Sequence, residues 1–180
     1  TTLVRSLIDT VQIKRDLHHA KFYNPDIIIA QMHWGNEYQA KPSAEQRKLA
    51  KFLQNNGVRI IIGHHPHVIQ PIEINKEDNQ ISSVTYYSLG NFISNQQGVN
   101  TDGGMLAEII ISKQNGSKEV IIESVGYSLI WVEKKREGEK IKYRLIPAEL
   151  INLTGLDKTD KTRMNTFLKN AENIIAPLQQ

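Results

Sequence analysis

Hydrophobic and polar positions in the first third of the chain follow first a helical and then an extended period. Residues 2–23 carry apolar side chains at helical spacing, and Asn24-Pro25 ends the pattern, which predicts an amphipathic helix. Residues 26–32 form a short, almost wholly apolar run, typical of a strand that is buried on both faces of a parallel sheet. Residues 58–62 form a second run of the same kind.

A second helix is expected between these two strands. Ser43 is placed to cap its N-terminus, and Gln46 lies three residues later, where it completes a capping box. Gly57 follows at the point where a helix end favours a left-handed residue. Residues 1–62 are therefore predicted to form helix–strand–helix–strand, an α/β unit with a right-handed crossover.

After Gly63 the pattern changes to short strands separated by turn residues. Asn115-Gly116 predicts a hairpin turn, and a last amphipathic helix is expected from Asp157 to near Pro177. The expected strands are residues 68–74, 81–87, 105–111, 120–127, 129–133 and 141–146. The whole pattern predicts a mixed fold at the border of the α/β and α+β classes.

Composition narrows the classes of function. The chain has 180 residues, the length of one domain, and a formal net charge of +3 from scattered basic residues, which argues against a nucleic-acid partner. It has no cysteine, which excludes thiolate zinc sites, iron–sulfur clusters and cysteine nucleophiles. Every apolar run is far shorter than the ~20 residues of a membrane-spanning helix, so no signal or transmembrane segment is predicted within the chain.

The histidines are the main candidates for chemistry. His64, His65 and His67 directly follow the second buried strand, and His33 directly follows the first. Because the carboxyl ends of parallel strands meet at one edge of a sheet, the two groups are predicted to lie side by side. Three or four imidazoles without thiolates suit Mn, Fe, Zn or Ni. His18 and His19, in the first helix, are instead expected to face solvent.

Two further residues have more than one interpretation. Glu37 either accepts a hydrogen bond from His33 or is a solvent-facing carboxylate of a loop. Asn91, within Tyr87–Phe92, either presents its amide to a ligand or belongs to a plain turn at the end of a strand. The residues by themselves leave both alternatives open.

Taken together, four segments resemble the CapA family of bacterial capsule or poly-γ-glutamate synthesis proteins, whose domain is related to calcineurin-like metallophosphoesterases. The resemblance covers about residues 1–112, and the order and spacing of the segments also fit. The segments are DIIIAQMHWGNEY at residues 26–38, PSAEQRKLAKFLQNNG at 42–57, VRIIIGHHPHVIQPIE at 58–73 and YSLGNF at 87–92.

The resemblance implies a fold of two packed sheets flanked by helices, with a metal site at the sheet edge. Residues 1–150 would form the C-terminal part of this domain and residues 151–180 a helical extension. His33 carries over as one metal ligand, and His65 and His67 as a His-x-His pair. The residues expected to line the site without a firm ligand role are His64, Glu37 and Asn91. The implied cofactor is a divalent Mn, Fe or Zn, with two cations in a full-length protein and incomplete binding here.

The family's first half, with its Gly-Asp motif and a second acidic residue, has no counterpart in this sequence. We therefore expect the chain to be the C-terminal half of the domain, with the missing N-terminal half as its partner, and to be inactive alone. A sheet without its first strands has an unpaired edge, which predicts a homodimer through that edge. The resemblance also implies a location in the cell envelope or outside the cell.

The function expected from the resemblance is capsule or poly-γ-glutamate biosynthesis at the bacterial surface. If the full-length protein is an enzyme, the reaction would be metal-assisted hydrolysis or transfer at a phosphoryl or acyl centre. One alternative is a non-catalytic module that binds an anionic polymer or an assembly partner through histidine hydrogen bonds. Another is a metal-dependent phosphoesterase unrelated to capsule, acting on phosphoester substrates.

Overall fold

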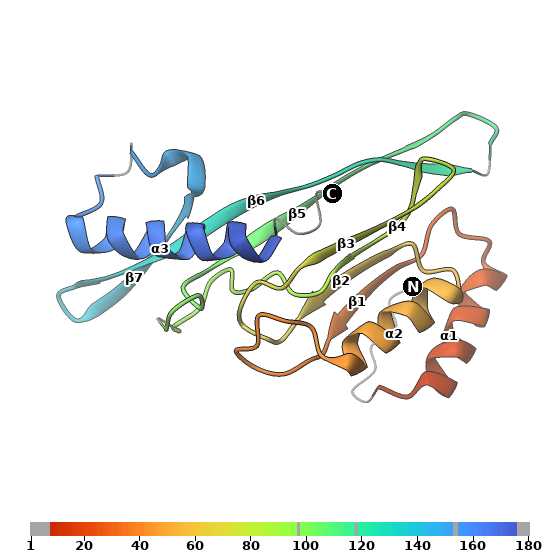
Figure 1. The fold of residues 1–180 in the computed structure, drawn as a ribbon, viewed down its shortest axis with the longest axis horizontal. Helices are drawn as coiled ribbons and strands as arrows, with labels where there is room; N and C mark the ends of the chain where they lie inside the picture. The colour runs from red at the N-terminus through yellow and green to blue at the C-terminus, as the bar shows by residue number, and fades with distance from the viewer. Residues whose placement is uncertain (1–7, 97, 118, 153–154, 176–180) are drawn as a thin grey trace.

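The computed structural model describes residues 8–96, 98–117, 119–152 and 155–175. These residues form three α helices, one short 3-10 helix and seven strands (Figure 1). In chain order the elements are α1 (Thr10–Phe22), β1 (Ile29–His33), α2 (Ala44–Asn55), β2 (Ile60–His64), β3 (Ile72–Glu77), β4 (Gln80–Tyr86), β5 (Gly103–Lys113), β6 (Val120–Glu137), β7 (Lys140–Pro147), η1 (Ala148–Leu150) and α3 (Lys158–Ile175).

The predicted start of α2 is confirmed. The Ser43 hydroxyl accepts a hydrogen bond from the Gln46 amide at 3.1 Å, and Gln46 Oε1 accepts one from the Ser43 amide at 2.9 Å, which completes the capping box. At α1, Asp9 is the N-cap and the helix begins at Thr10, whereas the prediction began at residue 2. Residues 2–7 of that prediction lie outside the described residues.

All seven strands join one open, mixed sheet. The order is β1-β2-β4-β6-β5, with β3 paired to β4 and β7 paired to β6. The β1–β2 and β2–β4 pairs are parallel, as predicted for the first two strands, and the remaining pairs are antiparallel. A mixed α/β fold is therefore confirmed, but as one continuous sheet rather than the two separate sheets that the resemblance implied.

The sheet has two parts, one formed by β1–β4 and the other by β5–β7, and it is narrow where β4 of the first part pairs with β6 of the second. Between β4 and β6 the ladder has one registered pair, Ile81 and Ile122. Arg59 reinforces this joint because its guanidinium donates to the carbonyls of Ser82 and Ile81, at 2.9 and 3.0 Å, and also to that of Val120. A single side chain thus links the start of β2, the start of β4 and the start of β6.

The main core lies between the two parts of the sheet. Tyr86 of β4 is fully buried, and its hydroxyl bonds to the carbonyls of Glu108 and Gly126 on the β5–β6 hairpin. Helix α3 lies along this hairpin in Figure 1 and closes the core at one end. The core is formed by buried residues of β2–β7 and α3: Ile60, Ile72, Val84, Tyr86, Met105, Ile122, Leu129, Trp131, Ile146, Met164, Phe167, Ala171 and Ile175.

A second, smaller core lies under α1 and α2, which are drawn next to β1 in Figure 1. Its buried residues are Trp34, Leu49, Ala50, Leu53, Val58, Ile61 and Tyr87. Strand β2 serves both cores, with Ile60 in the main core and Ile61 in the smaller one. The predicted burial of β2 on both faces is therefore confirmed.

The same prediction for β1 is wrong. Among the described residues β1 pairs with β2 alone, so it is an edge strand, and Ile29, Gln31 and His33 are exposed. Ala30 and Met32, on the alternate positions, pack against the smaller core. The apolar run of β1 is therefore only half covered in this chain.

The boundaries of two strands, β6 and β3, also differ from the prediction. The runs 120–127 and 129–133 form one long strand, β6, because Ser128 stays in the ladder opposite Leu106. The predicted strand from residue 68 begins at Ile72 as β3. The hairpin turn at Asn115-Gly116 is confirmed between β5 and β6, with Gly116 at φ 83°.

No described helix has the length and apolar character needed to cross a membrane.

Candidate functional site

The histidines lie at the carboxyl ends of β1 and β2, at one edge of the sheet. The two strands are paired in parallel so that His33 is opposite His64, and the His64 carbonyl accepts a hydrogen bond from the Trp34 amide at 3.1 Å. Beyond β2, His65 (φ 100°) and His67 (φ 61°) both have left-handed backbone conformations, which are unusual for residues with a side chain. This sharp turn brings residues 65–67 against the loop that follows β1. The Tyr38 amide in that loop donates a hydrogen bond to the Pro66 carbonyl at 2.8 Å.

Three of the imidazole rings form a row. The ring centroids of His33 and His65 are 4.6 Å apart, and those of His65 and His67 are 6.1 Å apart. The grouping expected from the two strand ends is thus present for these three rings, although His33 and His67 are separated by 34 positions in the sequence.

Within the described residues, one group of side chains has the geometry to hold a metal ion. Glu37, His65 and His67 each offer a ligand atom, and these atoms lie within 4.8 Å of one another. Glu37 Oε1 is 3.6 Å from His67 Nε2, so this carboxylate is on the His67 side of the row. Two imidazole nitrogens and a carboxylate oxygen are a donor set that suits divalent transition metals. His33 contacts the group through the ring of His65.

Asn91 fixes the orientation of His67. Its Nδ2 donates to the Thr101 carbonyl at 2.8 Å and to Gln96 Oε1 at 3.2 Å, so both amide hydrogens are used. Its Oδ1, 3.0 Å from His67 Nδ1, must therefore be the acceptor, and Nδ1 must carry the proton. In the neutral ring Nε2 then keeps its lone pair, on the side that faces Glu37.

His64 lies apart from this group. Its Nε2 is 3.3 Å from Gln31 Nε2 on the neighbouring strand. Burial lowers the pKa of His64, and the nearby His33 lowers it further, so the neutral ring is favoured. His18 and His19 are exposed on α1, as expected.

Buried amides hold the loop that carries Glu37 and Tyr38. Gln46 Nε2 donates to Gln70 Oε1 at 2.8 Å, and Gln70 Nε2 donates to the Gln39 carbonyl at 2.8 Å. Gln70 is fully buried, and its position within the apolar run of residues 68–72 is the one sequence signal that could have revealed this role. The sequence predicts a capping role for Gln46 but no role for Gln70.

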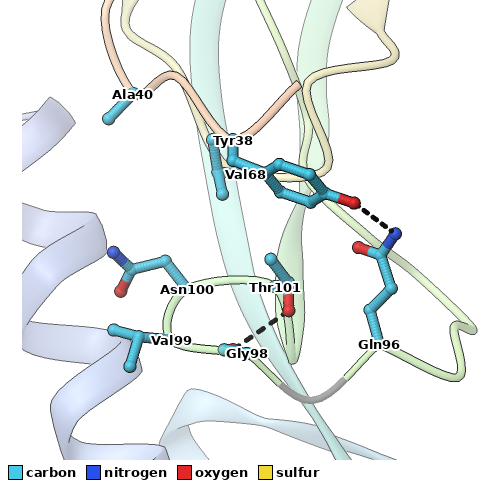
Figure 2. A pocket seen from close by; sticks show the side chains of 8 residues that line it. All are labelled: Tyr38, Ala40, Val68, Gln96, Gly98, Val99, Asn100 and Thr101. Carbon is cyan, nitrogen blue, oxygen red and sulfur yellow. Dashed lines mark hydrogen bonds between the residues drawn. The ribbon is translucent and has the colours of Figure 1, made fainter.

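A cavity of about 460 Å³ opens next to Tyr38 (Figure 2). Tyr38 joins it to the histidine row because its ring stacks on that of His67, with centroids 5.9 Å apart and planes 26° apart. The Tyr38 hydroxyl accepts a hydrogen bond from Gln96 Nε2 at 3.3 Å, and Val99, Asn100 and Thr101 line the cavity below. The sequence does not predict this cavity, because the cavity wall comes from a loop with no regular pattern of residues.

Residues 2–96 match the family model described as bacterial capsule synthesis protein PGA_cap. The chain belongs to this family. The part matched to PGA_cap contains α1, β1, α2, β2, β3 and β4, together with the histidine row, Glu37 and Asn91. The cavity wall formed by residues 98–101 lies beyond it.

Two curated relatives carry similar names. The chain is 41% identical over 92 residues to the PGA biosynthesis protein CapA of Bacillus subtilis (strain 168), and 38% identical over 94 residues to the capsule biosynthesis protein CapA of Bacillus anthracis. These alignments cover 51% and 52% of this chain but only 23% and 21% of the relatives. Most of the length of each relative is thus outside the matched region.

Proposed function

We propose that this chain forms the histidine side of a divalent-metal centre in a protein of bacterial capsule or poly-γ-glutamate biosynthesis. The convergence of Glu37, His65 and His67 within 4.8 Å carries the proposal. Membership of the PGA_cap family and the names of the two CapA relatives support the biological setting. We further propose that the whole domain has a phosphoesterase-like sandwich fold, that it lies in the cell envelope, and that its reaction is hydrolysis or transfer at a phosphoryl or acyl centre.

Each residue of the group has a defined part in this proposal. His67 offers Nε2 because Asn91 occupies its Nδ1. Glu37 supplies an anionic oxygen on the same side, and His65 lies between His67 and His33. This donor set fits Mn, Fe or Zn. A bound cation would polarise a phosphoryl or acyl oxygen and lower the pKa of bound water.

We also propose that the centre is completed by acidic side chains from another segment of the protein. The family resemblance assigns carboxylate ligands that bridge two cations to such a segment. With those ligands added, the site would hold two cations. The chain by itself would then bind one cation weakly and show no turnover.

Cation binding by the chain tests this proposal directly. Calorimetric titration with Mn²⁺ and Zn²⁺ should show binding by the natural chain and a loss of affinity of about tenfold or more in His67→Ala, since ligand geometry controls metal affinity. His18→Ala removes an exposed histidine of α1 and is the matched control, so its affinity should equal that of the natural chain. Equal binding by all three proteins, or none by any, would contradict the proposal.

Two further measurements separate the alternatives. Binding of poly-γ-glutamate to metal-free chain, unchanged in His67→Ala, would favour a polymer-binding module over a metal centre. Hydrolysis of generic phosphoesters by the full-length protein, with no effect of its deletion on capsule, would favour a phosphoesterase unrelated to capsule.

A further inference from the structure

We propose that helix α3 positions the metal ligand His67, with Arg163 and Asp102 as the positioning residues. The inference rests on the proposed function for the role of His67 as a ligand. The path runs from α3 to residues 98–103, which lead into β5, and from there to the amide that orients His67. Both α3 and residues 98–103 lie beyond the residues 2–96 that match PGA_cap.

Two of the groups that hold Asn91 belong to residues 98–103. The backbone amide of Asn91 donates to the Gly103 carbonyl at 3.0 Å, and Nδ2 of its side chain donates to the Thr101 carbonyl at 2.8 Å. Asn91 is buried, so its orientation depends on such protein groups rather than on bulk water.

The Thr101 carbonyl selects the orientation of the Asn91 amide. A carbonyl oxygen only accepts hydrogen bonds, so it must face the NH₂ group of Asn91, and this leaves Oδ1 towards His67. Gln96 also accepts from Nδ2, but an amide side chain can offer either its oxygen or its NH₂ group and does not select an orientation.

A displaced Thr101 carbonyl would leave the Asn91 amide able to turn by half a rotation. Nδ2 would then face Nδ1 of His67, which would become the acceptor, and the proton of the neutral ring would move to Nε2. The nitrogen on the side of Glu37 would have no lone pair for a cation. The position of the Thr101 carbonyl thus decides whether His67 offers Nε2 as a ligand atom.

An ion pair with α3 holds the peptide group that presents this carbonyl, because Asp102 directly follows Thr101. Asp102 Oδ2 accepts hydrogen bonds from Arg163 Nη2 at 3.2 Å and from Trp131 Nε1 at 3.0 Å. The Asp102 side chain is only 6% exposed, so its carboxylate needs a cationic partner to stay charged. Arg163 also lies over the Trp131 ring, 5.9 Å from the ring centroid.

Two more side chains of α3 contact the same segment. A Cβ atom at Gly103 would lie 2.5 Å from Phe167 Cζ, so Phe167 packs directly on the glycine backbone. Asn170 donates to Asn100 Oδ1 at 2.8 Å. Arg163, Phe167 and Asn170 are spaced by four and three residues, which places them on one face of the helix. Figure 1 shows α3 running along β5 and β6.

The test follows the His67 ring in the metal-free chain labelled with ¹⁵N-histidine. At about pH 8 imidazole is neutral, and the two ring-nitrogen shifts report which nitrogen carries the proton. His67→Ala identifies the signals of this ring by their loss. The natural chain should show a proton on Nδ1, and Arg163→Ala should show a mixture with Nε2. Arg163→Lys keeps the charge and should restore most of the natural pattern.

Cation affinity is the second readout. Arg163→Ala should bind Mn²⁺ or Zn²⁺ about tenfold more weakly than the natural chain, as expected for a residue that orients a ligand from outside the coordination sphere. The matched control is Arg144→Ala, which removes an ion pair with the buried carboxylate of Glu133 on the β6–β7 hairpin. This control should unfold at lower urea concentration and keep both the natural affinity and the natural His67 ring.

Asp102→Asn is the second variant, and it serves also if Arg163→Ala does not fold. It keeps an acceptor oxygen for Trp131 and removes the charge that faces Arg163, so the His67 proton should shift in the same direction. An unchanged ring and unchanged affinity in the folded variants, or an equal change in Arg144→Ala, would overturn the inference.

The ring measurement needs no cation, which keeps this inference apart from the proposed function. A natural chain that binds no cation, but whose His67 proton shifts in Arg163→Ala, would contradict the metal centre and sustain the positioning of His67 by α3. Cation binding that depends on His67 but not on Arg163 or Asp102 would have the opposite meaning.

Discussion

Asn91 accepts a hydrogen bond from Nδ1 of His67 across 3.0 Å, and this contact leaves Nε2 of the ring directed at Glu37. Partners of this kind typically control metal affinity by about 10- to 100-fold. Asn91→Ala should therefore weaken Mn²⁺ or Zn²⁺ binding by that order in calorimetric titration. Asn55→Ala, at an exposed position of α2, should have no effect.

Asn91→Asp gives the sharper comparison. It keeps an acceptor oxygen for His67 and removes the two hydrogen bonds that Asn91 donates to Thr101 and Gln96. Metal affinity should stay closer to that of the natural chain than in Asn91→Ala. An equal loss in both variants would mean that Asn91 acts through the loop rather than through His67.

Gln46 and Gln70 form a buried pair whose loss should affect stability. In Gln70→Leu, Gln46 loses its acceptor and the Gln39 carbonyl loses its donor. Unpaired buried polar groups cost about 1–3 kcal/mol each, so the free energy of unfolding should fall by that order. Urea unfolding of Gln46→Leu, Gln70→Leu and the double variant measures the coupling, and the double variant should lose less than the sum of the single losses. Strict additivity would show that the pair is not coupled.

Arg59 should hold the joint between β4 and β6. Arg59→Met keeps most of the apolar stem and removes the hydrogen bonds to the carbonyls of Ile81, Ser82 and Val120. Hydrogen bonds from a charged donor contribute about 1.5–3 kcal/mol each, so amide hydrogen exchange should rise at Ile81 and Ile122. Exchange at Leu49 and Leu53, in the smaller core, should change less. Uniform acceleration throughout the chain would instead indicate global destabilisation.

Glu133 should make the stability of the chain sensitive to acid. Burial opposes its ionisation, but hydrogen bonds and charges from Lys135 and Arg144 outweigh burial and lower the pKa of Glu133 below 4.5. A carboxyl with a lowered pKa in the folded state stabilises the fold above its unfolded pKa, and this contribution is lost as pH falls through the folded value. The stability difference between the natural chain and Glu133→Gln should therefore shrink on acidification below about pH 4.5.

Glu137→Gln is the control for this pH series. Glu137 pairs with Lys142 at 2.6 Å, but both side chains are well exposed, and exposed ion pairs contribute little to stability. Its unfolding free energy should follow that of the natural chain at every pH. A pH dependence as large as that of Glu133→Gln would contradict the assignment to Glu133.

Local sequence patterns predicted the structure correctly where residues close together in the sequence form it. The capping box of Ser43 and Gln46 and the hairpin at Asn115-Gly116 depend on residues a few positions apart, and both are observed. The exposure of β1 could not be predicted, because an apolar run indicates a strand but not how many strands flank it. Tyr38 and Gln96 were missed for a related reason, since a ring stack and a hydrogen bond over 58 positions leave no local signal.

By itself the sequence determined the helices, most of the strands, and the placement of His33 and the His65–His67 pair after parallel strands. Those features follow from hydrophobic period, capping chemistry and the rule that parallel strands end at one edge. The tertiary structure alone decided that Glu37 faces His67, that Asn91 fixes the protonated nitrogen of that ring, and that a cavity opens next to Tyr38, whose ring stacks on His67. The reason is physical: the direction of a side chain in a loop depends on hydrogen bonds to distant segments, and those partners are set only when the sheet and α3 have packed.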